Sequence, residues 1–256
     1  MHFLAEKVFS GTGRTWSAEH VQNLNPADLD AVYRGFYLSE SLEDDAVRAL
    51  LENQIKAERD MVPSLTPHME EKADLAFIWD RRLESFLKGR LGEATFYNLR
   101  KAIPPNWIVG QEQHFALGLP NNMQDSIGLA SLSRSKRAFV LKSSGFSGSA
   151  SWGEGVDFIH KKSAADAAQL LTAAHQDNSA LHVVQQFTKG KDHVLEYEDG
   201  AGGVVKMSAA RIRLTPYFSA VPGQEGKLVA AKATARENTD YIHGASDSIN
   251  SAVDSK

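Results

Sequence analysis

The chain contains no cysteine. That absence excludes disulfide bonds, zinc sites built from thiolates and cysteine nucleophiles. It also fits a chain that needs no oxidising compartment, because disulfides are rare in the cytosol. We therefore expect a cytoplasmic location.

Long apolar runs and a strong charge of one sign are lacking as well. No stretch approaches the roughly 18 apolar residues of a membrane helix, and residues 1–7 do not resemble a signal peptide. The 28 Lys and Arg residues against 32 Asp and Glu residues give a net charge of −4, so no global basic field attracts nucleic acid. Neither a membrane nor a nucleic acid is an expected partner.

The composition that remains is typical of a folded protein. Hydrophobic residues make up 42% and charged residues 23% of 256 positions, which allows one large domain or two small ones with a real core. Hydrophobic patterns predict helices at 43–58, 93–102, 126–132 and 163–176. They predict strands at 29–38, 61–62, 107–109, 138–142, 156–160, 182–187 and 193–197, with longer β-rich runs at 204–221 and 228–236. The polar tail at 246–256 is expected to fray.

Two helix starts have recognisable caps. Thr66 precedes Pro67, and this pair predicts a helix whose buried face carries Leu75, Ile78, Trp79 and Leu83. Ser163 is followed three residues later by an acid, as in a capping box. The strand, helix and short strand before Thr66 together suggest an α/β unit.

Residues 139–156 combine the features of a phosphate-binding loop. The predicted strand ends near Lys142, and residues 143–155 hold four glycines and five serines. Glycine permits positive φ, so that successive backbone amides can converge on one anion beside the lysine. A strand follows the loop, which predicts a hairpin and not a Walker loop, where the lysine comes after the glycines and opens a helix.

Other interpretations of these residues stay open. A Gly/Ser segment is often a flexible linker, although Phe146 and Trp152 are unusual in one. Lys142 also fits a solubilising residue on an edge strand. Lys72 could contact phosphate, but its position at a predicted helix start is more readily interpreted as a surface charge. The histidines show no zinc spacing, and no Gly-x-Ser-x-Gly hydrolase motif is present.

The order of several segments resembles the ATP-grasp superfamily, in a branch similar to glutathionylspermidine synthase-like carboxylate–amine ligases. The resemblance covers roughly residues 25–250, and each segment alone is weak. It rests on residues 32–34, on Glu71-Lys72 with Ile103-Pro104, on 140–155, on 183–187 and on 211–217.

The resemblance implies an α+β fold of two subdomains that clamp ATP and Mg²⁺. The segments would be a partial α/β unit at 1–65, a helical linker and first grasp segment at 66–135, and the nucleotide-binding core at 136–256. The implied phosphate ligands are Lys142, Ser144, Gly145, Gly148, Gly153 and Gly155, and the implied adenine hinge is Gln185, Gln186 and Phe187. Arg211 and Arg213 would be catalytic, and Asp247 and Asn250 would be the candidate metal ligands.

The implied reaction activates a small-molecule carboxylate as an acyl phosphate, which an amine then attacks. The chain departs from the family pattern at the hinge, where Gln185 and Gln186 replace a carboxylate, and at the metal site, where 247–250 is displaced toward the tail. Little of the usual N-terminal domain is visible. Three hypotheses stay open: a ligase, a nucleotide-binding module that acts with a partner protein, and a scaffold that binds no nucleotide.

Overall fold

The computed structural model describes residues 31–33, 38, 45–56, 60–62, 64–110, 119, 123, 125–145, 150, 155–199, 201–219, 225–242 and 248–253. The chain divides into two compact units, residues 1–186 and 187–256. Helices and mainly antiparallel sheets give the expected α+β class. The predicted boundaries at 65/66 and 135/136 both fall inside the first unit. Among the helices described, none is long and apolar enough to cross a membrane.

The first unit begins with a strand, a helix and a second strand, the order that the sequence pattern predicts. These elements are β1 (Ala31–Tyr33), α4 (Asp45–Lys56) and β2 (Asp60–Val62). The two strands pair in parallel, with Val32 opposite Met61. A helical connection of this kind is what parallel neighbours require.

The helix predicted to begin at Thr66 is wrong as a single helix. The chain forms three pieces instead: η2 (Pro67–Glu70), α5 (Asp74–Phe77) and α6 (Glu84–Leu91). The Thr66 side chain pairs with Ser64 and caps no helix amide, and Leu75 is 43% exposed although Ile78 is buried. The helix predicted at 93–102 is confirmed as α7 (Glu93–Ala102). The break between η2 and α5 leaves residues 71–73 as a turn.

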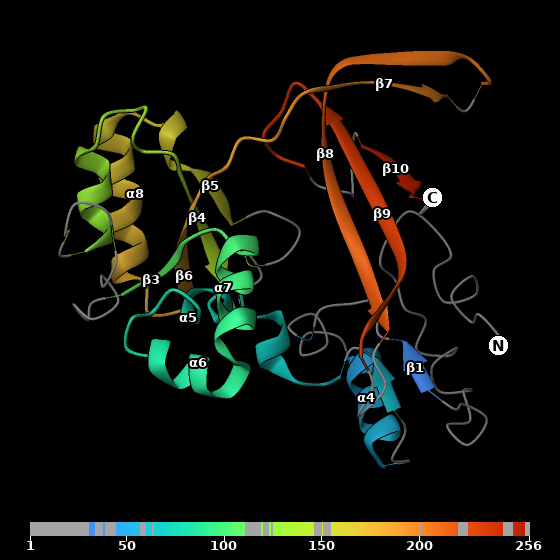
Figure 1. Ribbon diagram of the computed structural model, residues 1–256, viewed down its shortest axis with the longest axis horizontal. Coiled ribbons are helices and arrows are strands. Elements are labelled where there is room, and N and C mark those ends of the chain that lie inside the picture. The colour runs from blue at the N-terminus through green and yellow to red at the C-terminus, as the bar shows by residue number, and fades with distance from the viewer. Residues whose placement is uncertain are drawn as a thin grey trace. The chain divides into compact units, whose positions relative to one another are not determined.

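A four-stranded antiparallel sheet forms the centre of the first unit (Figure 1). Its strands, in spatial order, are β3 (Asn106–Val109), β6 (Leu181–Gln186), β4 (Phe139–Ser144) and β5 (Val156–Phe158). Strands β4 and β5 pair on either side of the glycine-rich loop, with Lys142 opposite Val156. The predicted hairpin around that loop is therefore confirmed.

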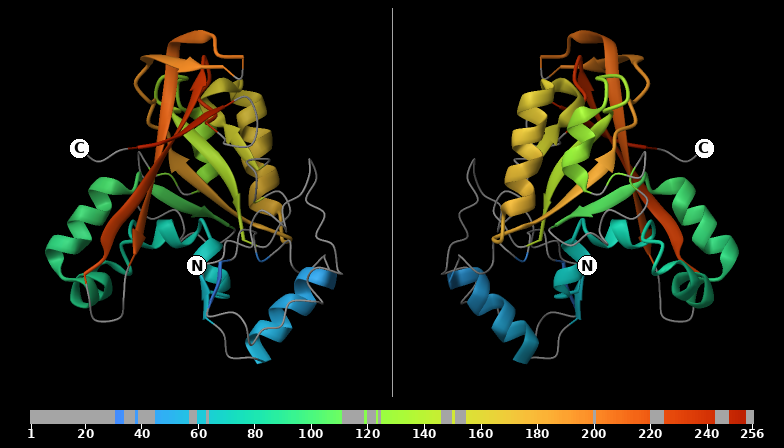
Figure 2. Two further views of the ribbon diagram at one scale, coloured as in Figure 1. Left: turned by 90° about the vertical axis from the view of Figure 1, so that its right-hand side faces the viewer. Right: turned by 90° about the vertical axis from the view of Figure 1, so that its left-hand side faces the viewer.

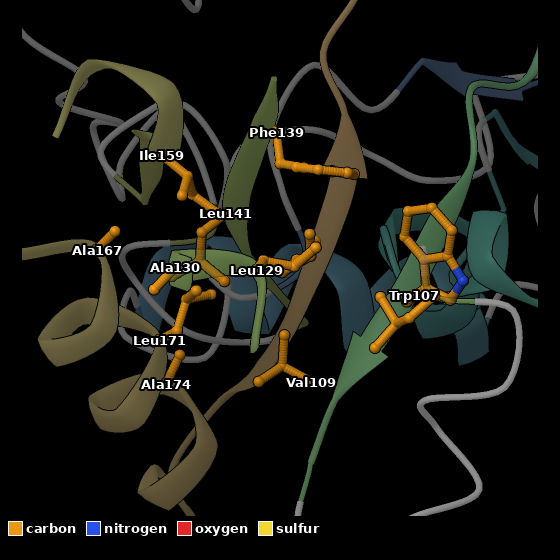
Figure 3. Close-up of a cluster of buried hydrophobic side chains, with 12 residues drawn as sticks. Trp107, Val109, Leu129, Ala130, Phe139, Leu141, Ile159, Ala167, Leu171 and Ala174 are labelled. Carbon is orange, nitrogen blue, oxygen red and sulfur yellow. The ribbon is translucent and has the colours of Figure 1, made fainter. Parts of the chain in front are cut away.

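Helix α8 (Ala164–Gln176) lies along one face of this sheet (Figure 2). Ser163 caps it as predicted, because its Oγ accepts a hydrogen bond of 3.1 Å from the Asp166 amide. The short helices η5 (Ser126–Ser131) and η7 (Ile159–Lys161) complete this layer. Figure 3 shows the core between helices and sheet, which includes Trp107, Val109, Leu129, Phe139, Leu141, Ile159, Ala167, Leu171 and Val184. Phe139 and Leu141 face this core, so strand alternation turns Lys142 to the opposite face.

The second unit is a separate antiparallel sheet in the order β10-β9-β8-β7. Its strands are β7 (His193–Glu198), β8 (Val204–Ser219), β9 (Lys227–Glu237) and β10 (Ile249–Ala252). The two long strands match the two long β-rich runs of the sequence. The expectation that the whole tail frays is wrong for β10, which pairs with β9 through Asn250 opposite Thr234.

We expect Leu171→Ala to destabilise the first unit by about 2–5 kcal/mol, because it leaves a cavity in the core beneath α8. Leu171 is fully buried, whereas Gln169 on the same helix is exposed. Tryptophan fluorescence during urea unfolding follows this unit selectively, since all four tryptophans precede residue 187. Gln169→Ala is the control and should change the unfolding free energy by less than about 0.5 kcal/mol. Equal effects of the two variants would contradict the assigned core.

Candidate functional site

Lys142 lies on the sheet face that α8 does not cover. Its ammonium group donates a hydrogen bond to Gln185 Oε1 on the neighbouring strand β6. Gln185 pairs with Val140, which shares a face with Lys142, so the register of β4 and β6 brings the two side chains together. Because lysine can only donate, the amide oxygen of Gln185 must face Lys142, and its NH₂ group points elsewhere.

Lys72 comes to the same strand end from a distant part of the sequence. Its Nζ donates to the Ser143 carbonyl oxygen at 2.8 Å and also to the Ala150 carbonyl oxygen. Lys72 thus binds the backbone at the start of the glycine-rich loop and at Ala150 within it, and it is half-buried. The interpretation of Lys72 as a surface charge is wrong. Its proximity to Lys142 depends on tertiary structure, and no local pattern indicates it.

Ser144 joins the turn at 71–73 to the end of β4. Its Oγ donates to Glu71 Oε2 at 2.7 Å and accepts from the Ala73 amide at 2.9 Å. Ser144 is 1% exposed, so both bonds are shielded from water. The predicted site residue Ser144 therefore has a structural partner on each side of Lys72.

The electrostatics of the two lysines favour an anion. Burial lowers the pKa of Lys142, and the nearby charge of Lys72 lowers it further. Burial also lowers the pKa of Lys72, while the Glu71 carboxylate opposes that shift. The described acceptors of both ammonium groups are neutral amide and carbonyl oxygens. An anion with several oxygens would stabilise two such charges more strongly than these acceptors do.

Two of the four glycines of the loop, Gly145 and Gly155, lie within the described residues. Gly145 has φ of +81°, a conformation that glycine adopts without strain. The Gly155 carbonyl accepts from the Ser143 amide at 2.9 Å and so closes the base of the hairpin. Gly148 and Gly153 lie outside the described residues. Gly145 and Gly155 thus define the two ends of the loop.

The predicted hinge lies at the end of β6. The Gln186 amide donates to the Pro105 carbonyl oxygen at 2.8 Å, and the Gln186 side chain is exposed. Phe187 is half-buried and is the first residue of the second unit. Of the predicted hinge residues, Gln185 bonds Lys142 directly.

The two predicted catalytic arginines differ in their surroundings. Arg211 is 12% exposed and pairs with Asp192, at 2.9 Å from Nε to Oδ1, and with Asp240. Arg213 is exposed and donates to the Ile242 carbonyl oxygen at 3.1 Å. They share one face of β8, as strand alternation predicts. The charge of Arg211 is already offset by carboxylates, which makes Arg213 the more accessible cation.

The predicted metal ligands do not form a site in the part of the chain described. Asp247 lies outside the described residues, and Asn250 Oδ1 accepts a hydrogen bond of 2.9 Å from Thr234 Oγ1. The described residues contain no group of three or more His, Cys, Asp and Glu side chains arranged to hold a metal ion. The magnesium site at Asp247 and Asn250 therefore stays a prediction.

Comparison with protein-family models, with curated proteins and with solved structures finds no match to this chain. The candidate function therefore depends on the residues around Lys72 and Lys142.

We expect Gly145→Ala to lower the unfolding free energy of the first unit by about 1–2 kcal/mol, because an L-residue is strained at positive φ. A Cβ there would also lie 2.8 Å from Glu71 Oε1, so the carboxylate would have to move. The matched control is Gly89→Ala in helix α6, where a Cβ meets nothing within 4 Å. That variant should gain up to about 1 kcal/mol from helix propensity. Urea unfolding followed by tryptophan fluorescence measures both, and a neutral Gly145→Ala would contradict the loop geometry.

Proposed function

We propose that the first unit binds the phosphates of ATP through Lys72 and Lys142. The observation that carries the proposal is the meeting of two half-buried ammonium groups, from separate segments, at the base of a glycine-rich hairpin. A triphosphate offers the several anionic oxygens that two such cations and nearby backbone amides would bind. A single carboxylate would match this arrangement less well, because it carries one negative charge.

The base of the nucleotide would lie near the end of β6. The role of Gln185, Gln186 and Phe187 as a hinge follows from the resemblance to ATP-grasp proteins. The bond between Lys142 and Gln185 supports it, since Gln185 contacts a proposed phosphate ligand directly. The NH₂ group of Gln185, turned away from Lys142, could then donate a hydrogen bond to a ring nitrogen of the base.

We further propose an ATP-grasp fold and a carboxylate–amine ligase reaction. The antiparallel sheet with its lysine strand and hairpin loop, followed by a second antiparallel sheet, supports this assignment. The γ-phosphoryl group would pass to an oxygen of the substrate carboxylate, which releases ADP and forms an acyl phosphate. The amine nitrogen would attack the carbonyl carbon, phosphate would leave, and the nitrogen would lose a proton to solvent. The catalytic role of Arg211 and Arg213 follows from the resemblance, in which an arginine offsets the charge that develops, and Arg213 is the more exposed of the two.

A second candidate is a nucleotide-binding module without turnover, acting beside a partner protein. Two observations in the second unit favour it. Arg211 is already paired with Asp192 and Asp240, and the Asn250 side chain is bound to Thr234. Side chains satisfied by protein neighbours have less capacity for substrate or metal. This candidate shares the ATP site of the first unit and differs in catalysis alone.

Thermal unfolding with and without ATP tests the proposed site, with Mg²⁺ present and absent. At one hundred times its dissociation constant, a ligand adds about 2.7 kcal/mol to the unfolding free energy. We expect this shift in the wild type and its loss in Lys142→Met and in Lys72→Met. Lys101→Met is the control, because Lys101 is exposed at the end of α7. No shift in the wild type would reject ATP binding and leave the scaffold hypothesis.

The ligand-free Lys142→Met variant should be more stable than the wild type, by about 1 kcal/mol, because it removes a poorly solvated charge. The destabilisation by Lys142 is fully present below its lowered pKa. It diminishes as the pH rises toward the ordinary lysine value, because in that window the unfolded chain binds more protons. Urea unfolding near neutral pH and at alkaline pH measures the difference, which should shrink at the higher pH. A variant less stable than the wild type would show that Lys142 has a structural role.

Release of ADP in the presence of pairs of carboxylates and amines separates the two candidates. The ligase should form ADP when a carboxylate is supplied and turn over when an amine is added. The module should bind ATP and form no ADP with any pair. Arg213→Met should reduce turnover and leave ATP binding to the first unit intact, whereas equal loss of both would place Arg213 among the binding residues.

A further inference from the structure

Glu71 contacts both the phosphate-site strand and the loop that follows it. One carboxylate oxygen accepts the 2.7 Å hydrogen bond from Ser144. The same hydroxyl accepts from the Ala73 amide at 2.9 Å, so residues on both sides of Lys72 are bound to one buried side chain of β4. Because Lys142 lies two residues before Ser144 on that strand, these bonds set the position of Lys72 relative to Lys142.

The second contact of Glu71 is with the backbone of Gly145. A Cβ on this glycine would lie 2.8 Å from Oε1 and 3.2 Å from Oε2 of the carboxylate. The carboxylate is therefore packed against the first residue of the loop, in a space that only glycine leaves open. A hydrogen bond on one side and a close backbone on the other leave the Glu71 side chain little rotational freedom.

We infer that Glu71 is a positioning residue of the nucleotide site: through Ser144 it holds Lys72 beside Lys142, and its carboxylate is a fixed counter-charge beside Lys72. The inference rests on the proposed function of this site. Glu71 is not itself a phosphate ligand, because a carboxylate repels phosphate. It acts on the ligand through Lys72.

The charge effect and the geometric effect of Glu71 are separable. Burial lowers the pKa of Lys72, and the Glu71 carboxylate raises it again. The charge of Lys72 in turn lowers the pKa of Lys142, which reaches the site from β4. Without the Glu71 charge, Lys72 would lose its proton at a lower pH, and the site would lose one of its two cations. The Ser144 bonds act on position and not on charge.

The first test measures ATP affinity as a function of pH in Glu71→Gln, Ser144→Ala and the wild type. Glutamine can still accept the Ser144 hydrogen bond, so Glu71→Gln removes the charge and keeps the shape. As the pH rises, we expect the ATP affinity of Glu71→Gln to begin to fall at a lower pH than that of the wild type. Ser144→Ala should bind about tenfold more weakly at every pH, because the hydrogen bond that it removes has a charged acceptor and is worth about one decade in an equilibrium constant. Glu93→Gln, an exposed acid at the start of α7, should follow the wild type.

The second test needs no nucleotide. An NMR titration of ¹³C-methylated lysines, with the Lys72 signal assigned through Lys72→Arg, gives the pKa of Lys72 in the ligand-free protein. A lower value in Glu71→Gln than in the wild type supports the inference, and an unchanged value overturns it. Coinciding pH profiles of affinity for Glu71→Gln and the wild type would also overturn it. If the wild type binds no ATP, the proposed function fails, while the titration still decides whether Glu71 controls the charge of Lys72.

Discussion

The candidate site depends on one shared hydroxyl group. Ser144 Oγ bonds both Glu71 and the Ala73 amide and thereby attaches the turn at 71–73 to the end of β4. Lys72 comes to the loop because of this attachment, and the loop begins at Gly145 because the Glu71 carboxylate occupies the adjoining space. The local break between η2 and α5 is what allows the turn to form. A continuous helix from Thr66 would carry these groups on a regular surface, away from the strand end.

Lys72 and Lys142 differ from Arg211 in the charge of their described acceptors. In the first unit, the described acceptors of Lys72 and Lys142 are uncharged oxygens, so an anionic ligand can still lower the electrostatic energy. In the second unit, Arg211 lies between two carboxylates, and Arg236 and Arg213 donate to the carbonyl oxygens of Tyr241 and Ile242. Three arginines thus hold one short segment after β9. These arginines therefore stabilise the segment that follows β9.

The sequence predicted correctly those elements that depend on residues close together in the chain. The cap at Ser163, the helix at 93–102 and the hairpin around residues 143–155 all follow from neighbours in the chain, and the structure has each of them. The Thr66-Pro67 start was misleading for two reasons: the Thr66 hydroxyl pairs locally with Ser64 and caps no helix amide, and the turn at 71–73 makes its contacts with the distant Ser144. The strand before Lys142 and the glycine-rich loop after it were enough to predict this lysine as a candidate phosphate ligand. The contacts of Glu71 and Lys72 could not be predicted, because both residues bind a strand end some seventy positions later.

The large sequence separation between these contacting residues affects how the protein folds. The bond from Lys72 to Ser143 spans 71 positions, and β6 with Gln185 comes later still. Contacts between such distant positions raise the contact order, and loop-closure entropy must be overcome before they contribute. During synthesis from the N-terminus, α6 and α7 can form while both lysines still lack the sheet that joins them. We therefore expect the contacts of the two lysines to form late in folding, once β6 has inserted between β3 and β4.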